Sequence, residues 1–246
     1  MKRVITALTA AVLLLTACGS KTSQTSNDYS VYNEEQNQPG DSTLYGLACE
    51  GCTDSVVIFL PFSGGDPDTF NVINARKHHK VFGRPRIGDE LAIVRNATEK
   101  QTADIVVNLD ILKGEWCYKV MPQFRQRLGQ PAQGKAPQLP PTLPDSLRKA
   151  WTTPREYGID IRREHVAHPI GMTFGNDNEQ SPVVFPPVKL YREWRIHNGQ
   201  LLLKESRIDS LGNHQVFNCD TADIVLLRRD TLVLRFKDSE QGYYRR

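Results

Sequence analysis

Short apolar runs separated by turn residues dominate residues 44–112. Val56–Leu60 is a run rich in β-branched residues that stops at Pro61, and Leu91–Val94 and Ala103–Leu109 have the same character. Apolar runs of this length, bounded by Gly, Pro and Asp, are typical of β-strands, and no stretch here keeps a helical period. We therefore expect residues 44–112 to form a small, barrel-like β domain.

The clearest pattern lies in residues 188–246, where Asn198-Gly199 separates the segments Tyr191–His197 and Gln200–Glu205, in which apolar and charged residues are mixed. Asn-Gly is the strongest signal for a two-residue hairpin turn, because both turn positions need positive φ. Such a turn fixes the register of the two strands and gives favourable cross-strand pairs. The predicted pairs are Ile196 with Leu201, Trp194 with Leu203, Glu193 with Lys204, and Arg192 with Glu205.

Two further strands are expected at Ile224–Leu227 and Leu232–Phe236, around a turn at Arg229-Asp230, with another turn at Asp209–Asn213. The end of the chain is thus predicted to be a β-meander. The overall fold class expected from the pattern is all-β.

Proline interrupts the middle of the chain. Residues 122–187 hold eleven of the fifteen prolines, which excludes central strands and long helices from much of this segment. One short helix is predicted over Leu147–Trp151. We expect the remainder to be a long insertion, with the proline-rich part at 131–144 acting as a semi-rigid lid or rim.

The N-terminal segment has the build of a secretory signal. Lys2 and Arg3 precede the apolar run Val4–Leu15, which is too short to span a bilayer. Leu15-Thr16-Ala17-Cys18 resembles the lipobox of bacterial lipoproteins. The resemblance implies cleavage after residue 17 and acylation of Cys18. We expect residues 18–43, which are mostly polar, to be a flexible tether.

The expected cellular location and the net charge restrict which molecules the protein can bind. Gly19 stands where inner-membrane retention signals usually carry Asp, so the outer membrane is the expected location, facing either the periplasm or the exterior. The formal net charge is +3, of which Lys2 and Arg3 supply two. Neither this charge nor this compartment fits nucleic acid as a partner, so the expected contact is with the membrane, through the lipid anchor.

Four cysteines remain besides Cys18, in an oxidising compartment. Cys49 and Cys52 are spaced for a local disulfide, a redox dithiol or half of a metal site, and we expect the disulfide. Cys117 and Cys219 are the candidates for a second pair. No arrangement of His, Cys, Asp or Glu predicts a resident metal or cofactor, and no motif predicts an enzyme.

Two resemblances to known families add to this interpretation. Gly114-Glu115-Trp116, followed by the Asn198-Gly199 hairpin and the ending Thr231–Leu234 and Tyr243–Arg245, is similar to lipocalin-like domains of bacterial lipoproteins. That resemblance implies a C-terminal barrel over residues 113–246 whose base is plugged by Trp116. Gly46–Ser55 resembles the start of NlpE-family envelope lipoproteins, in which a Cys-x-x-Cys begins a strand and which are associated with envelope sensing.

These observations predict a non-catalytic binding module for a small apolar or amphipathic ligand. Alternate residues of the barrel strands should face that ligand, and the candidates are Trp116, Trp194, Ile196, Leu201 and Leu203. The alternative is an envelope stress or redox sensor that uses Cys49 and Cys52 and signals through an envelope protein partner.

Overall fold

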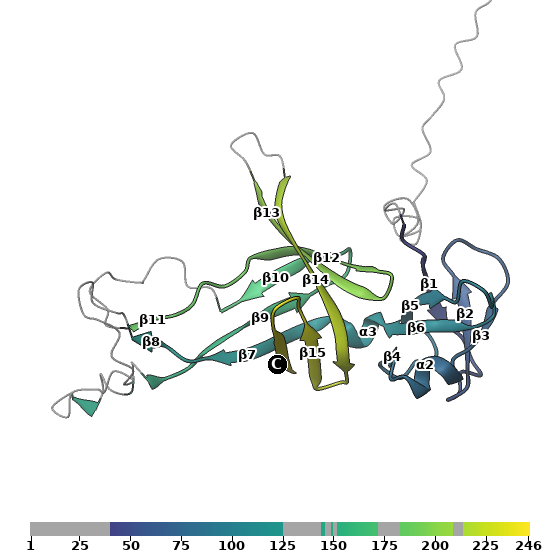
Figure 1. Ribbon diagram of the computed structural model, residues 1–246, viewed down its shortest axis with the longest axis horizontal. Helices are drawn as coiled ribbons and strands as arrows, with labels where there is room; N and C mark the ends of the chain where they lie inside the picture. The colour runs from purple at the N-terminus through teal and green to yellow at the C-terminus, as the bar shows by residue number, and fades with distance from the viewer. Residues whose placement is uncertain (1–39, 125–143, 146–148, 150–151, 172–182, 209–213) are drawn as a thin grey trace, which may run out of the picture.

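The computed structural model describes residues 40–124, 144–145, 149, 152–171, 183–208 and 214–246. In these residues the fold is all-β, with two sheets joined by the one-turn helix α3 (Leu109–Leu112) (Figure 1). The expected signal, tether and proline-rich rim fall almost wholly outside the described residues, as do most of the predicted helix at 147–151 and the turn at 209–213. Within the described ranges, no helix has the length and apolarity needed to cross a bilayer.

The first sheet contains six strands of the described chain in the order β3-β2-β1-β5-β6-β4. All its pairs are antiparallel except β4 with β6. The sheet curls, because Asn71 at the end of β3 forms a bridge with Thr102 beside β6. Its strands are β1 (Thr43–Ala48), β2 (Val56–Pro61), β3 (Asp68–Asn71), β4 (Val81–Phe82), β5 (Glu90–Arg95) and β6 (Ala103–Asn108).

Strands β5 and β6 are buried on both faces, which explains their continuous apolar sequence. Leu91 and Ile93 pack inside the small sheet, whereas Ala92 between them joins the core of the second sheet. Val106 and Val107 of β6 divide in the same way. The helix α2 (Ile73–Lys77) also packs near β6. The two sheets therefore share a continuous apolar contact.

The second sheet contains eight strands of the described chain in the order β10-β9-β7-β16-β15-β14-β13-β12. It is nearly closed into a barrel, since Trp194 N donates to His165 O at 2.8 Å and Val166 bridges Glu193. A separate ribbon pairs β8 (Gln123–Phe124) with β11 (Val183–Val184). The barrel strands are β7 (Gly114–Val120), β9 (Arg155–Ile161), β10 (Ala167–Ile170), β12 (Tyr191–His197), β13 (Gln200–Ile208), β14 (His214–Leu227), β15 (Thr231–Arg235) and β16 (Glu240–Arg245).

The predicted hairpin register is confirmed for three of its four pairs, namely Ile196 with Leu201, Trp194 with Leu203, and Glu193 with Lys204. The fourth pair is wrong. A β-bulge between Tyr191 and Glu193 leaves Arg192 without a partner in the ladder and places Tyr191 opposite Glu205. The bulge reverses which side of the sheet the start of β12 presents, so Tyr191 rather than Arg192 is buried.

The tip of this hairpin docks on the first sheet. Asn198, with φ of 48°, accepts from Ser42 N at 2.9 Å through Oδ1 and donates to Gly40 O at 2.9 Å through Nδ2. The Tyr45 hydroxyl donates to Ile196 O at 2.7 Å. These contacts fix the small sheet against one end of the barrel.

Candidate functional site

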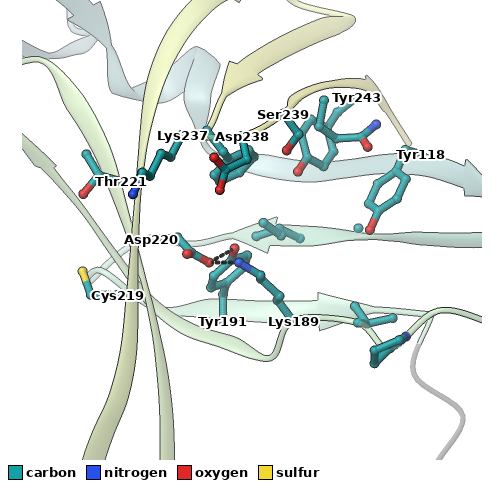
Figure 2. A pocket seen from close by; sticks show the side chains of 16 residues that line it. Tyr118, Lys189, Tyr191, Cys219, Asp220, Thr221, Lys237, Asp238, Ser239 and Tyr243 are labelled. Carbon is teal, nitrogen blue, oxygen red and sulfur yellow. Dashed lines mark hydrogen bonds and ion pairs between the residues drawn. The ribbon is translucent and has the colours of Figure 1, made fainter.

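A pocket of ≈ 560 Å³ lies at the end of the barrel away from α3. The end of β7, the segment before β12, the middle of β14 and the turn between β15 and β16 line it (Figure 2). This volume is within the range of about 300–1,000 Å³ that small-molecule sites occupy. The barrel therefore has an open mouth at this end, with room for a small guest.

An ion pair stands on one wall of the pocket. Asp220 Oδ2 accepts from Lys189 Nζ at 2.5 Å and from the Tyr191 hydroxyl at 2.5 Å (Figure 2). Burial raises the pKa of the Asp220 carboxyl, but the hydrogen bonds from Lys189 and Tyr191 outweigh burial, so its pKa lies below the usual value. Burial and the bond to Asp220 raise the pKa of Tyr191. The wall thus presents a stable carboxylate and a neutral phenol.

The opposite wall is aromatic. The rings of Tyr118 and Tyr243 meet edge to face with centroids 5.3 Å apart, and Tyr118 makes a similar contact with Tyr157 at 6.3 Å. Burial, followed by the neighbouring phenols, raises the pKa of Tyr118 and of Tyr243. Both phenols line the pocket, and no hydrogen bond to another described residue engages either hydroxyl. They are available to a guest.

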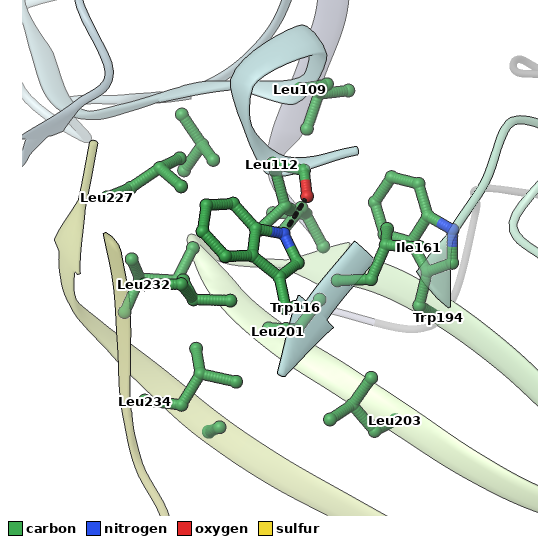
Figure 3. Close-up of a cluster of buried hydrophobic side chains, with 14 of the residues drawn as sticks. Leu109, Leu112, Trp116, Ile161, Trp194, Leu201, Leu203, Leu227, Leu232 and Leu234 are labelled. Carbon is green, nitrogen blue, oxygen red and sulfur yellow. Dashed lines mark hydrogen bonds between the residues drawn. The ribbon is translucent and has the colours of Figure 1, made fainter. Parts of the chain in front are cut away.

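The five side chains that the sequence predicts to face a ligand lie elsewhere. All are at most 3% exposed and belong to the close-packed cluster beside α3, and none lines the pocket (Figure 3). Alternation correctly indicates that they point inward, but this half of the interior is filled by its own side chains. The structure thus places Trp116, Trp194, Ile196, Leu201 and Leu203 in the packed core and not at the pocket.

The pocket residues continue the same inward alternation toward the mouth. Tyr118 follows Trp116 by two positions on β7, and Asp220 precedes the buried Ala222 by two on β14. Polar-tipped side chains replace aliphatic ones at this end of the strands. Extending the inward-outward alternation of side chains beyond the apolar residues would have identified both Tyr118 and Asp220. It would have placed Tyr191 on the outer face, because the alternation does not show the bulge at Arg192.

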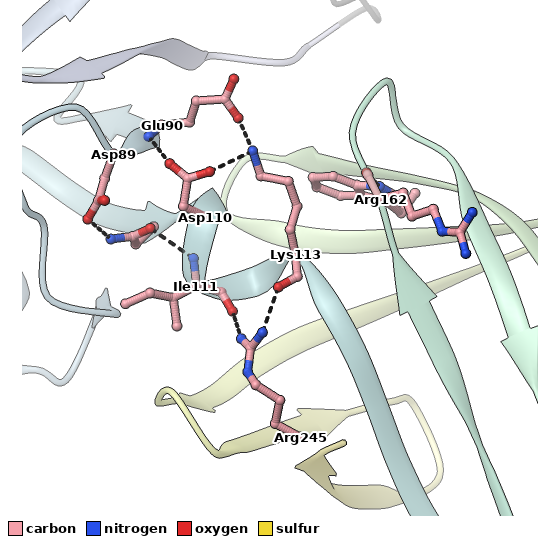
Figure 4. A network of polar contacts seen from close by, with 9 residues as sticks. Asp89, Glu90, Asp110, Ile111, Lys113, Arg162 and Arg245 are labelled. Atoms are coloured by element: carbon pink, nitrogen blue, oxygen red, sulfur yellow. Dashed lines mark hydrogen bonds and ion pairs between the residues drawn. The ribbon is translucent and has the colours of Figure 1, made fainter.

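The closed end is braced by polar contacts around α3 (Figure 4). Lys113 Nζ pairs with Asp110 at 2.8 Å and with Glu90 of the small sheet. Arg245 donates to Lys113 O at 2.9 Å and also to Ile111 O. The Trp116 indole donates to Leu112 O at 2.6 Å. This end is therefore sealed, and the mouth is at the opposite end.

All four described cysteines are free thiols, so the expected Cys49–Cys52 bridge is not formed. Cys52 Sγ instead donates to Cys49 O at 3.2 Å and accepts from Ile58 N at 3.3 Å. Burial raises the pKa of the Cys52 thiol. A thiol held this way is less reactive than a redox-active one, which needs a lowered pKa.

The second expected bridge, Cys117 to Cys219, is also not formed. Cys117 lies on β7 and Cys219 on β14, and β16 and β15 separate these strands in the sheet. Three strand spacings amount to about 14 Å, twice the span of a disulfide. Among the described residues, no three His, Cys, Asp or Glu side chains gather in a way that could hold a metal ion.

Comparison with known proteins bears on the barrel. Residues 150–246 match the model of the lipocalin-like family. The part of the chain that forms β9 to β16 is therefore similar to that family. Among solved structures, the chain is similar to a lipocalin-like protein from Bacteroides thetaiotaomicron, at 20% identity and a TM-score of 0.26, over 52% of this chain and 95% of that one. No curated protein matches the chain.

Proposed function

We propose that this protein is a non-catalytic binding module, held to the outer membrane of a bacterium by lipid on Cys18, whose ligand is a small amphipathic molecule. The observation that carries the proposal is the pocket at the barrel mouth. Its wall combines apolar surface from Ile159, Val188 and Phe236 with a few convergent polar groups. That mixture is typical of ligand sites in barrels.

The filled half of the barrel supports the position of the site. Trp116 and Trp194 are at most 3% exposed, and their indole nitrogens donate to Leu112 O and Arg162 O. A guest there would have to displace packed side chains and break these hydrogen bonds. A guest at the mouth displaces water instead, which is the less costly alternative.

Titration with a neutral fluorescent apolar probe, N-phenyl-1-naphthylamine, tests the proposal. The full chain carrying Cys18→Ala, which removes the expected acylation, should bind the probe saturably. Val188→Trp should abolish binding, because the added ring occupies the pocket. The matched control is Val216→Trp, an exposed position on β14 outside the pocket. Absence of saturable binding, or equal binding by the Val188→Trp protein, would refute the site.

A further inference from the structure

The formal charges of the side chains that line the pocket sum to zero. Of the described residues that line it, four belong to types that carry a formal charge: Lys189, Asp220, Lys237 and Asp238. Lys189 and Asp220 form a direct ion pair, and Lys237 and Asp238 are neighbours in the turn between β15 and β16. An anionic head group would meet Lys189 already neutralised and Asp220 beside it. A cationic head group would meet Asp220 already neutralised and the positive charge of Lys189 beside it. The site therefore favours a neutral head group.

The hydrogen-bonding groups of the pocket are complementary to one another. Both bonds to Asp220 end on Oδ2, and no hydrogen bond from another described residue reaches Oδ1. A carboxylate can accept about four hydrogen bonds, so Oδ1 remains an acceptor for a ligand donor. The phenols of Tyr118 and Tyr243 stay protonated and supply donors on the facing wall. A ligand that fits must both donate and accept hydrogen bonds, which a hydroxyl group can do.

Aromatic and aliphatic surface lies between these polar groups. The rings of Tyr118 and Tyr243 and the side chains of Ile159, Val188 and Phe236 line the same pocket. A long alkyl chain alone would leave Asp220 Oδ1 and both phenols without partners once water is displaced, at about 1–3 kcal/mol for each group. A head group bearing several hydroxyls removes that penalty.

We propose that the pocket binds a neutral amphiphile with a polyhydroxylated head group, such as an alkyl or acyl glycoside, with the hydroxyls between Asp220 and the phenols of Tyr118 and Tyr243. This inference rests on the function proposed above and specifies its ligand class. The tail lies against the aliphatic part of the wall.

Displacement of N-phenyl-1-naphthylamine from the full-length Cys18→Ala protein by three amphiphiles with the same eight-carbon tail tests this inference. They are octyl β-glucoside, octyl sulfate and octyltrimethylammonium, each used below its micelle-forming concentration. The glucoside should displace the probe at a concentration at least about tenfold lower than either ion, equivalent to one well-made hydrogen bond to a charged group.

Substitutions in the ion pair should change this order in opposite directions. Asp220→Asn leaves Lys189 unpaired, so octyl sulfate should gain about tenfold and the glucoside should lose about tenfold. Lys189→Gln, at an exposed side chain, removes the positive charge beside Asp220 and should favour octyltrimethylammonium. Asp223→Asn is the matched control on β14, because Asp223 bonds Gln200 and does not line the pocket.

The outcomes separate the two proposals. If the wild-type pocket does not bind the probe, the binding function and the ligand class both fail. If the probe binds but an ionic amphiphile competes best, or all three compete equally, only the ligand class is wrong. If Asp220→Asn does not fold, judged by its thermal transition, the Lys189→Gln comparison decides. An unchanged order of competitors in that variant would overturn the assignment.

Discussion

The guanidinium of Arg245 lies over the indole ring of Trp116, with 4.3 Å between Cζ and the ring centroid. A side chain of the last barrel strand, β16, thus covers an aromatic side chain of the first, β7. The same guanidinium donates to the backbone carbonyls of Ile111 and Lys113 (Figure 4) and to that of Arg229. Arg245, at the end of β16, therefore connects this strand to the start of β7 and to α3, at the closed end of the barrel.

Arg245→Ala should lower the free energy of unfolding by about 2–3 kcal/mol, because several charge-assisted hydrogen bonds and a cation–π contact are lost. Arg245→Lys should restore only part of this, since an ammonium cannot bridge two carbonyls in one plane. Arg246→Ala is the control, because its side chain is 60% exposed and its ion pairs are at 3.5 Å or more. Urea denaturation of the three variants measures the difference, and equal losses for Arg245→Ala and Arg246→Ala would contradict the bracing role.

Asn198→Ala should destabilise the protein by about 1–2 kcal/mol. Alanine is strained at φ of 48°, and it cannot make the bonds to Ser42 and Gly40. Asn198→Gly tolerates positive φ and isolates the loss of the hydrogen bonds, so it should fall between wild type and Asn198→Ala in thermal unfolding. Hydrogen exchange at residues 42–45 should rise in both variants. Unchanged exchange there would show that the tip does not hold the small sheet.

The thiols should differ in reactivity. Cys219 is exposed, whereas Cys117 is fully buried and its pKa is raised to about 11, first by burial and then by Glu156. Iodoacetamide at pH 8 should alkylate Cys219 in the native protein and reach Cys117 only after unfolding. Mass spectrometry of the digested protein gives the order, with Cys219→Ser as the control. Rapid native alkylation of Cys117 would contradict its buried position on β7.

Asp220 should contribute to the acid sensitivity of the fold. Its pKa is lowered from the usual 3.8, so its stabilising effect is present above that value and is lost as the pH falls through the lower, folded-state pKa. Asp220→Asn should flatten the decline in melting temperature over this range. Asp223→Asn on the same strand should leave the decline unchanged. Parallel curves for wild type and Asp220→Asn would place the effect elsewhere.

Cys18→Ala should release the protein from membranes. Without the thiol there is no acylation, and so no lipid chain to insert into the bilayer. Fractionation of cells with palmitate labelling measures both effects, and Cys219→Ser serves as the control for a lost thiol. Continued membrane association and labelling of the Cys18→Ala protein would refute the anchor.

The register of β12 with β13 could be predicted because Asn198-Gly199 permits one tight turn and the pairs on both faces agree with it. The error at Arg192 has a local cause. A β-bulge costs little at the end of a strand, and the sequence of Tyr191–Glu193 carries no mark of it. The short helices α2 and α3 were not predicted, since four or five residues are too few to show a period.

The candidate site was harder to predict than the fold. Alternation indicates that Leu201 and Leu203 point inward, but it cannot tell whether the space between facing strands is filled or empty. That depends on the small sheet and α3, which close one end of the barrel, and on Lys189 and the turn at 236–239, which lie in connections without a period. Whether two cysteines can form a disulfide likewise depends on which strands become neighbours in the sheet, and the sequence pattern does not show this.

The docking of Asn198 on residues 40–43 also determines how a pulling force would pass through the molecule. If the chain is held by its N-terminal segment, the force acts at Gly40. The hydrogen bond from Asn198 passes it to the His197 end of β12, whereas Tyr191 lies at the other end of that strand. Seven residues of strand, about 23 Å, separate that point from the mouth. A load on these hydrogen bonds therefore reaches the pocket only through the whole length of β12.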